Sequence, residues 1–413
     1  MAGEEIIVGL DIGTSKIAAI IGNTWQGDPE KIEIIGVGTA PSEGLRKGVV
    51  VDIDLTTTAI RQAVETAELM AGVQIGSVYA GIAGGHITGQ TSHGLVAVSG
   101  EGHEITQSDV ERAINAAQAM KIPVEREILH VIPQGFIVDE QGGIKDPVGM
   151  SGVRLEAYVH IITGAVASAQ NLVKSIYNAG ISVEDIILEP IASAESVLTP
   201  EEKSVGVALA DMGGGTTDVV IYKDGTLHHS AVLSLGGHHI TNDIAQILKI
   251  TPQDADKIKL RYGCASVDLV DQNDAIPIST VGGVHKPRFI TRRDLAEIIQ
   301  CRMDEFLNLI GQEIYNCNLT IPAGVVLTGG TALLEGLLES AEQAFPCPVR
   351  VGYPCPLKGL TEKIHSPVYA TGVGLVLAGA MEHYRAPKRT FIKGTNLFDQ
   401  IFKRMRRWFQ DWL

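Results

Sequence analysis

A short motif that occurs twice, 200 positions apart, constrains this chain more than any other feature. Residues 8–16 read V-G-L-D-I-G-T-S-K, and residues 209–220 read L-A-D-M-G-G-G-T-T-D-V-V. In each copy an apolar strand ends at an aspartate, and a glycine follows two positions later. Glycine lets a turn adopt positive φ and approach a ligand closely, so successive N–H groups can converge on an anion such as phosphate. The separation is too great for a solenoid repeat and predicts one hairpin in each of two domains.

Asp11 and Asp211 end the two strands, where a carboxylate is suited to hold a hydrated Mg²⁺ ion beside a phosphate. A glycine-rich hairpin that binds nothing is the alternative for either copy taken alone. A third segment, residues 325–334 (V-V-L-T-G-G-T-A-L-L), predicts a strand running through Gly329 and Gly330 into a helix. The pattern G-x-x-x-x-G-K-[ST] does not occur, which argues against a P-loop enzyme.

The composition is that of a globular protein: 413 residues, 45% hydrophobic and 20% charged, enough for two or more domains. A net charge of −15 argues against a nucleic-acid binder. From residue 385 onward, however, the chain contains eight basic residues and only two acidic ones, which indicates a separate role for the tail. The five cysteines form no C-x-x-C pattern and suggest reduced thiols in a cytoplasm. The N-terminus does not resemble a secretory signal, and no apolar run approaches the roughly 18 residues of a membrane span.

The region between residues 84 and 160 predicts a compact α/β insert. Residues 91–98, 128–138 and 153–162 read as strands, and Thr106 with Asp109 resembles a capping box at the start of a helix. About eighty residues are enough for a small domain of its own.

Residues 233–245 place Gly236 and Gly237 before a helix N-terminus. Unpaired N–H groups and the helix dipole point the same way there, so this is a further site suited to an anion. His238 and His239 follow, but adjacent helical side chains diverge by about 100° and no Cys or Asp cluster accompanies them, so we predict no metal site at the pair.

Two phosphate hairpins and a Gly-Gly turn together resemble the actin-like ATPases, which include actin, the heat-shock chaperone ATPases and the sugar kinases. The segments L-H-V-I-P-Q at 129–134 and G-I-K-D-P-V-G-M-S-G-V-R at 143–154 resemble, more narrowly, bacterial cell-division members of that family. The resemblance implies an α/β fold, namely an actin-like (ribonuclease-H-like) two-domain ATPase fold with a small α/β insert, called 1C, and a C-terminal amphipathic helix. The implied segments are subdomain 1A at 1–83 and 162–200, the insert 1C at 84–161, subdomain 2A at 201–231 and 318–361, subdomain 2B at 232–317, a helix returning to 1A at 362–384, a linker at 385–395 and the amphipathic helix at 396–413.

By the same resemblance, the two domains close on ATP and Mg²⁺. The implied catalytic residues are Asp11, Asp211 and Glu189, with Asp11 and Asp211 holding Mg²⁺ through water. The implied ATP-binding residues are Gly13, Thr14, Ser15, Lys16, Gly213, Gly214, Gly215, Thr216, Thr217, Gly236, Gly237, Lys257, Gly329, Gly330 and Thr331.

Two of these assignments have alternatives. Glu189, in a segment that resembles the family's first interdomain connector, would orient the attacking water, or it merely caps the helix that follows. Lys257, in D-A-D-K-I-K-L-R-Y, would contact the ribose and adenine, or its helix is a solvated charged one.

A local basic cluster stands out on the acidic chain: Lys286, Arg288, Arg292, Arg293 and Arg302. The cluster is an ordinary solvated face or a dock for an acidic peptide. The resemblance favours the dock, because in the cell-division members subdomain 2B captures the C-terminal tail peptide of the tubulin-like division protein FtsZ.

The final segment, residues 396–413, predicts an amphipathic helix in a lipid interface. Its apolar positions are spaced by one, three or four residues, with basic residues on the flanks: Leu397, Phe398, Ile401, Phe402, Met405, Trp408, Phe409, Trp412 and Leu413. The helix is too short and too charged to span a bilayer. A core helix or a coiled-coil arm is the alternative, although such helices seldom combine this aromatic density with so many basic residues.

The resemblance implies an ATP-binding actin homologue of bacterial cell division. Such a protein would polymerise with itself on the inner face of the cytoplasmic membrane at the septum, as a peripheral protein, and tether FtsZ filaments to an anionic membrane surface. It would recruit later divisome proteins through 1C, and its ATP turnover would be slow. The alternatives are a soluble actin-fold ATPase or phosphotransferase, such as a sugar kinase, and a pilus-assembly or cell-shape actin homologue.

Overall fold

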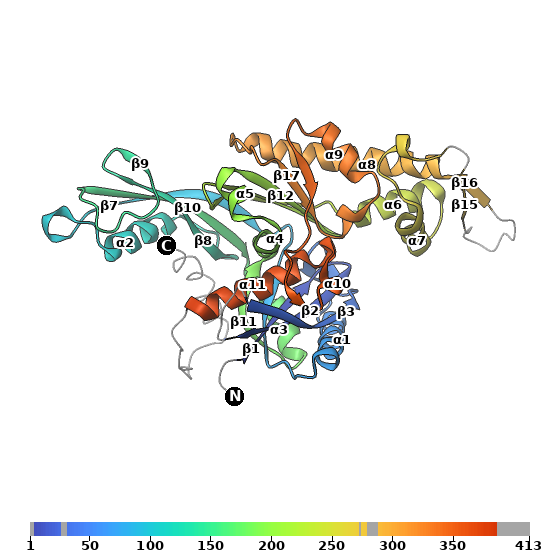
Figure 1. Ribbon diagram of the computed structural model, residues 1–413, viewed down its shortest axis with the longest axis horizontal. Coiled ribbons are helices and arrows are strands. Elements are labelled where there is room, and N and C mark those ends of the chain that lie inside the picture. The colour runs from blue at the N-terminus through green and yellow to red at the C-terminus, as the bar shows by residue number, and fades with distance from the viewer. Residues whose placement is uncertain (1–3, 26–30, 272–273, 279–287, 386–413) are drawn as a thin grey trace.

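The computed structural model describes residues 4–25, 31–271, 274–278 and 288–385 (Figure 1). Two β-sheets lie on either side of two central helices, α4 (Glu189–Val197) and α11 (Ala370–Arg385). A third, smaller sheet extends to one side (Figure 1). The predicted terminal helix at 396–413 lies outside the described residues. Within the described part, no helix is both long and apolar enough to cross a membrane.

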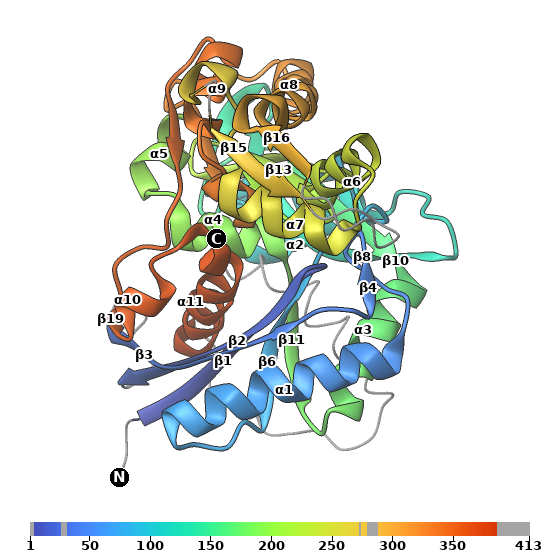
Figure 2. The ribbon, with the colours of Figure 1, turned by 90° about the vertical axis from the view of Figure 1, so that its right-hand side faces the viewer.

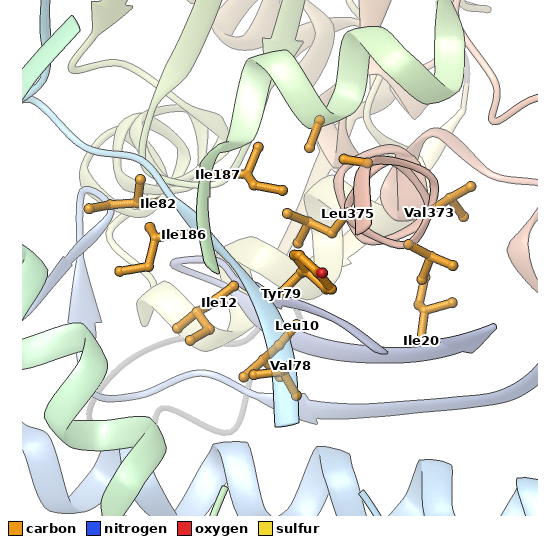
Figure 3. Packing of buried hydrophobic residues seen from close by; sticks show 14 of the residues in the cluster. Leu10, Ile12, Ile20, Val78, Tyr79, Ile82, Ile186, Ile187, Val373 and Leu375 are labelled. Atoms are coloured by element: carbon orange, nitrogen blue, oxygen red, sulfur yellow. The ribbon is translucent and has the colours of Figure 1, made fainter. Parts of the chain in front are cut away.

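The first sheet has the strand order β11-β6-β1-β2-β3-β19. Its strands are β1 (Glu4–Ile12), β2 (Lys16–Trp25), β3 (Ile32–Pro41), β6 (Ser77–Ile82), β11 (Ser182–Leu188) and β19 (Lys358–Gly359). Helices α1 (Ile53–Ala71) and α3 (Val166–Asn178) cover one face and α11 (Ala370–Arg385) the other (Figure 2). Small residues let α11 pack closely, and its Val373 and Leu375 lie against the sheet beside Ile20 and Tyr79 (Figure 3).

The second sheet has the strand order β14-β13-β12-β17-β18. Its strands are β12 (Val207–Met212), β13 (Thr217–Lys223), β14 (Thr226–Leu233), β17 (Val325–Thr328) and β18 (Val349–Val351). One face packs on α4 (Glu189–Val197). The core on the other face includes residues of α6 (Gly237–Leu248), α7 (Pro252–Tyr262), α8 (Arg292–Asn316) and α9 (Leu337–Ala344).

The two sheets repeat one topology. Read from β3, the first runs β3-β2-β1-β6-β11, with β1 and β2 antiparallel and β1 and β6 parallel. The second runs β14-β13-β12-β17-β18 with the same senses. The twin motif therefore marks two copies of one α/β unit, and the predicted actin-like fold class is confirmed.

The insert is a four-stranded sheet of order β7-β10-β8-β9 with one helix, α2 (Gln107–Gln118), packed on it. Its strands are β7 (Thr88–Ala97), β8 (Arg126–Val138), β9 (Gln141–Ile144) and β10 (Arg154–Ala165). The capping box of Thr106 and Asp109 is present as predicted. The insert has its own apolar core, and three of its strands lie against the edge strand β14 of the second sheet.

The remaining elements connect these units. They are β4 (Leu45–Arg46), β5 (Val49–Val50), η2 (Glu101–His103), α5 (Pro200–Val205), η3 (Val267–Leu269), β15 (Ala275–Ile278), β16 (Arg288–Thr291), η4 (Gly330–Leu333), α10 (Thr361–Ile364) and η5 (Pro367–Tyr369).

Candidate functional site

A cavity of about 770 Å³ lies between the two hairpin turns. It brings together segments from both sheets, from α4, α6 and α7, from the Gly-Gly turn and from the start of α11. Fifteen predicted site residues line it: Asp11, Gly13, Thr14, Ser15, Lys16, Glu189, Asp211, Gly213, Gly214, Gly215, Thr216, Gly237, Gly329, Gly330 and Thr331. The structure thus gathers residues that lie more than 300 positions apart in the sequence.

The two hairpins have the same geometry. In the first, the N–H of Gly13 donates to the carbonyl of Lys16 (3.1 Å), and in the second the N–H of Gly213 donates to the carbonyl of Thr216 (2.9 Å). Asp11 pairs with Ala18 across the first hairpin, as Asp211 pairs with Asp218 across the second. The two turns therefore have one backbone geometry, and glycine residues of both line the cavity.

The first aspartate is paired with a cation. The Nζ atom of Lys16 lies 3.7 Å from Asp11 Oδ2 and donates to the carbonyl of Val368 (2.9 Å), above the ring of Tyr369. Burial raises the pKa of the Asp11 carboxyl, and the charge of Lys16 opposes that rise. Burial likewise lowers the pKa of Lys16, with Asp11 opposing.

The second aspartate is paired with hydroxyl groups. Ser193 Oγ donates to Asp211 Oδ2 (2.5 Å), and Thr371 Oγ1 donates to the same oxygen (3.2 Å). Burial raises the pKa of Asp211 to about 6, while the bond from Ser193 lowers it. Gly329 has φ of +86° and its Cα lies so near Asp211 that a Cβ would stand 2.4 Å from Oδ1. Only glycine fits there.

Glu189 lies at the first position of α4, with its side chain on the cavity wall. The N-cap position belongs to Leu188, which makes no side-chain cap, so Glu189 is not the capping residue of this helix. Burial, and then the charges of Asp11, Asp218 and Asp211, raise the pKa of Glu189 well above its usual range.

Contacts close the cavity from the side of the second domain. Ser15 Oγ lies 2.9 Å from His238 Nε2 of α6, which joins the first hairpin to the second domain. The N–H of Gly237 donates to the carbonyl of Gly213 (3.0 Å), and Thr331 Oγ1 donates to it as well (3.0 Å). Burial and the nearby Lys259 lower the pKa of His238.

Three predicted residues do not line the cavity. Gly236 lies behind the second hairpin, where its backbone packs on Gly214, and Thr217 donates to the carbonyl of Leu235 (2.9 Å). Lys257 is placed elsewhere altogether: its side chain is 78% exposed and its partner is Asp254. Two positions on, Lys259 lines the cavity instead, since residues two apart face different sides of a helix.

Sequence reasoning missed several cavity residues: Asp218, His238, Asp256, Lys259 and Thr371. Asp218 had a signal, since it is the second acid of the segment 209–220 and follows Asp211 by seven positions. His238 followed a glycine pair already assigned to the site. Lys259, Asp256 and Thr371 carried no local signal that separated them from their neighbours.

The residues present fit a magnesium-bound nucleotide. Four carboxyl groups, those of Asp11, Glu189, Asp211 and Asp218, line one region of the cavity beside Lys16. Asp218 Oδ1 is buried and has no hydrogen-bond partner among the described residues. Such an excess of carboxylate oxygen suits a hydrated divalent cation. Within the described part, no group of three or more His, Cys, Asp or Glu side chains is arranged to hold a metal ion directly.

The predicted basic cluster is only partly described. Arg302 donates to both carboxylate oxygens of Asp243 (2.5 and 2.9 Å) and pairs with Glu305. Arg292 pairs with Glu335 (2.5 Å) and Arg293 with Glu297 (3.5 Å). Lys286 lies outside the described residues. Arg288 belongs to β16. The nine apolar residues predicted to contact lipid, from Leu397 to Leu413, lie outside the described residues.

Two α/β units of one topology, each contributing a glycine hairpin to a shared cavity, define the actin-like class. Solved structures share this fold at low identity: a PilM-PilN type IV pilus biogenesis complex (TM-score 0.67, 16% identity, covering 91% of this chain and 98% of the other) and MreB5 of Spiroplasma citri bound to ADP (TM-score 0.52, 13%, 92% and 96%).

Within that class the chain belongs to the FtsA family of cell-division proteins. It is 43% identical to the cell division protein FtsA of Pseudomonas aeruginosa over 98% of both chains. It is 40% identical to that of Escherichia coli, over 98% of this chain and 97% of the other. The model of the FtsA family matches residues 208–374, and that of the SHS2 domain inserted in FtsA matches 84–163. A role in cell division follows from this membership.

Proposed function

We propose that the chain binds ATP with Mg²⁺ between its two hairpins and serves cell division as a membrane-bound actin homologue. The observation that carries the ATP site is the pair of hairpins in one register, facing one cavity with Asp11 and Asp211 at matching positions. The cavity volume of about 770 Å³ is that of a ligand site rather than of a packing defect.

In this proposal the hairpin N–H groups and Lys16 hold the phosphates, and Asp11 and Asp211 hold water molecules of the cation. A bound magnesium ion supplies positive charge that offsets the phosphates and the surrounding carboxylates. Glu189 orients a water molecule. Burial and the neighbouring acids raise the pKa of Glu189, and a raised pKa makes the ionised carboxylate a stronger base toward that water. In this proposal ATP turnover is slow, as the resemblance to the cell-division members implies.

Lys259 and Lys257 offer a matched test of the nucleotide site. Lys259 lines the cavity and donates to the carbonyl of Gly237 (3.2 Å) and to Thr241 (2.7 Å), whereas Lys257 lies outside. We expect Lys259→Ala to weaken binding of a fluorescent ATP analogue by about tenfold, the effect of one hydrogen-bonded charge, and Lys257→Ala to leave it unchanged. Equal affinities of the two variants, at equal melting temperatures, would contradict the proposal that Lys259 lies in the nucleotide site and Lys257 outside it.

The second part of the proposal concerns residues 396–413 as a membrane anchor. Buried aromatic area and roughly 1 kcal/mol for each basic residue near an anionic surface give reversible attachment of one copy. Head-to-tail assembly of many copies makes attachment persistent by avidity. The protein would then lie at the cytoplasmic face of the inner membrane at the division septum.

Co-sedimentation with anionic vesicles, with and without ATP, tests this anchor. Trp408→Glu places a charge in the apolar stripe, and Gln410→Glu places the same charge outside it. We expect the intact chain and Gln410→Glu to pellet, more strongly with ATP, and Trp408→Glu to remain in the supernatant. Equal pelleting of the two variants would remove the anchor from the proposal.

The third part is a dock for the acidic C-terminal tail of FtsZ at Lys286, Arg288, Arg292, Arg293 and Arg302. The arginines Arg292, Arg293 and Arg302 all have carboxylate partners, so an incoming peptide would compete with them. Asp243→Asn removes one of the two carboxylate partners of Arg302 without removing the arginine. If Arg302 is a docking residue, we expect Asp243→Asn to strengthen peptide binding and Arg302→Gln to weaken it. Unchanged affinity in both variants would exclude Arg302 from the dock.

We also propose that 1C contacts neighbouring copies and later divisome proteins. Its own apolar core and its place at the side of the molecule support a separate surface (Figure 1). The segment boundaries given above, from 1–83 to 396–413, remain the proposed division of the chain.

A further inference from the structure

Asp211 reaches from one half of the molecule into the other. It ends β12 in the second sheet, but its hydroxyl partners belong to two helices of the centre: Ser193 to α4 and Thr371 to α11. Ser193 is fully buried, so water does not compete for its bond, and Thr371 is nearly buried at the wall of the cavity.

The two helices also hold each other. Ser193 Oγ lies 3.0 Å from Thr371 Oγ1, and one turn on Ser196 Oγ donates to the carbonyl of Ala370 (2.6 Å). Helix α11 packs on β1, β2 and β6 of the first sheet, and α4 begins where β11 of that sheet ends. The carboxylate of the second hairpin is therefore bound to one helix, α11, that packs on the first sheet and to another, α4, that leaves the first sheet and packs on the second.

Both hydroxyls act on one oxygen. Oδ2 of Asp211 accepts from Ser193 and from Thr371, while Oδ1 points to the Gly-Gly turn, close to Gly329. Saturating one carboxylate oxygen fixes the rotation of the group and leaves the other oxygen for a different partner. This division suits a carboxylate that must present one oxygen to the water shell of a cation.

We propose that Ser193 and Thr371 are positioning residues that orient Asp211 for hydrated Mg²⁺ and thereby link cation binding to the closed arrangement of the two domains. The proposal rests on the nucleotide site proposed above. Neither residue needs to touch the nucleotide or the cation, because each acts through Asp211.

The alternative is that the two hydroxyls merely fill polar positions in a tight helix crossing. Ser196 separates the two explanations. It is buried in the same crossing and bonded across the same helix pair, but its hydroxyl donates to the carbonyls of Ala370 and Ser193 and not to Asp211. Ser196→Ala therefore reproduces the packing change of Ser193→Ala without changing the aspartate.

The experiment measures binding of a fluorescent ATP analogue to the full chain while Mg²⁺ is titrated, and again in EDTA. We expect Ser193→Ala and Thr371→Val to raise the Mg²⁺ concentration for half-maximal binding by about tenfold, as expected for a lost hydrogen bond to a charged group. Affinity of Ser193→Ala in EDTA should stay within about twofold of the wild type, since Ser193 does not line the cavity and a bond that acts only through the cation has no effect without it. Thr371→Ser should restore the wild-type Mg²⁺ dependence.

A double-mutant cycle with Asp211→Asn completes the test. If Ser193 acts through Asp211, Ser193→Ala adds nothing to the Mg²⁺ dependence of Asp211→Asn. The inference is overturned if Ser193→Ala and Ser196→Ala have the same effect, or if affinity falls equally with and without Mg²⁺. Failure of the wild type to bind nucleotide at all would instead overturn the proposed function, and this inference with it.

Discussion

The two phosphate hairpins have one backbone geometry but stabilise their aspartates by different chemistry. Both turns close with the same N–H to carbonyl bond, and both aspartates lie at the same register. In the first hairpin the neighbouring charge is the ammonium of Lys16 (3.7 Å). In the second, the position that corresponds to Lys16 is Thr216, and Asp211 is held by hydroxyls from α4 and α11.

The two hairpins also differ at the residue that pairs with each aspartate on the second strand. The residue across from Asp11 is Ala18, whereas the residue across from Asp211 is a second acid, Asp218. The first hairpin therefore carries its own countercharge, while the second carries an excess of buried carboxyl groups. The two turns share a backbone geometry, but the first lies beside a lysine and the second beside a second buried acid.

The largest expected effect comes from the packing behind the second hairpin. A Cβ at Gly236 would stand 2.6 Å from the main chain of Gly214, whereas nothing lies within 4 Å of a Cβ at Gly76 in the first domain. We expect Gly236→Ala to abolish measurable nucleotide binding and to cost about 3 kcal/mol of stability, because the hairpin backbone must move. Gly76→Ala should be neutral in both assays. Normal nucleotide affinity of Gly236→Ala would show that the second hairpin tolerates displacement.

The next effect distinguishes the two hairpins directly. Lys16→Met removes the first hairpin's cation and leaves Asp11 buried without it, so nucleotide affinity should fall by about 10- to 100-fold. Thr216→Val, at the corresponding position, removes only a hydroxyl that donates to Asp218 (3.1 Å), and we expect a loss of about fivefold or less. Calorimetric titration with ATP measures both. A larger loss in Thr216→Val would reverse the assignment of the phosphate charge to the first hairpin.

A third prediction concerns the extra acid. Burial and the charge of Asp211 raise the pKa of Asp218 to about 8, well above the usual range of an aspartate. The folded state therefore keeps a proton that the unfolded chain loses, and this group makes stability fall as pH rises from about 4 to about 8. Asp218→Asn should remove that loss. The free energy of unfolding of the variant minus that of the wild type should be about 2 kcal/mol larger at pH 7 than at pH 5. Urea unfolding of both proteins at the two pH values, without nucleotide, measures the difference. The same change in stability with pH for the variant and the wild type would show that Asp218 is solvated.

The smallest effect concerns the bond between the halves. Ser15→Ala removes the contact of the first hairpin with His238, worth about 1 kcal/mol as a neutral hydrogen bond. We expect faster hydrogen exchange in α6 and an unchanged rate in α1, which makes no such contact. An unchanged exchange rate in both helices would mean that the bond does not contribute to closure.

Local sequence was sufficient for much of the fold. The paired hairpins follow from an apolar strand, an aspartate and a glycine, and the helix of the insert begins at Thr106 because its capping box is a contact between residues three apart. The start of the first long helix is less clear from the sequence: its N-cap is Asp52, but Asp54 and Thr56 are also suitable caps within about one turn. Element boundaries depend on such small energy differences.

The sequence by itself determined the duplicated α/β plan, the two aspartates and the glycine turns, because each depends on residues that are neighbours in the chain. Only the tertiary structure decided which lysine of α7 faces the cavity, that His238 meets Ser15, and that Ser193 and Thr371 share Asp211. Those contacts join residues 18 to 223 positions apart, and their geometry comes from the packing of α4 and α11 between the sheets and of α6 on the other face of the second sheet. No local pattern encodes a hydrogen bond whose partners are brought together only when the two domains pack.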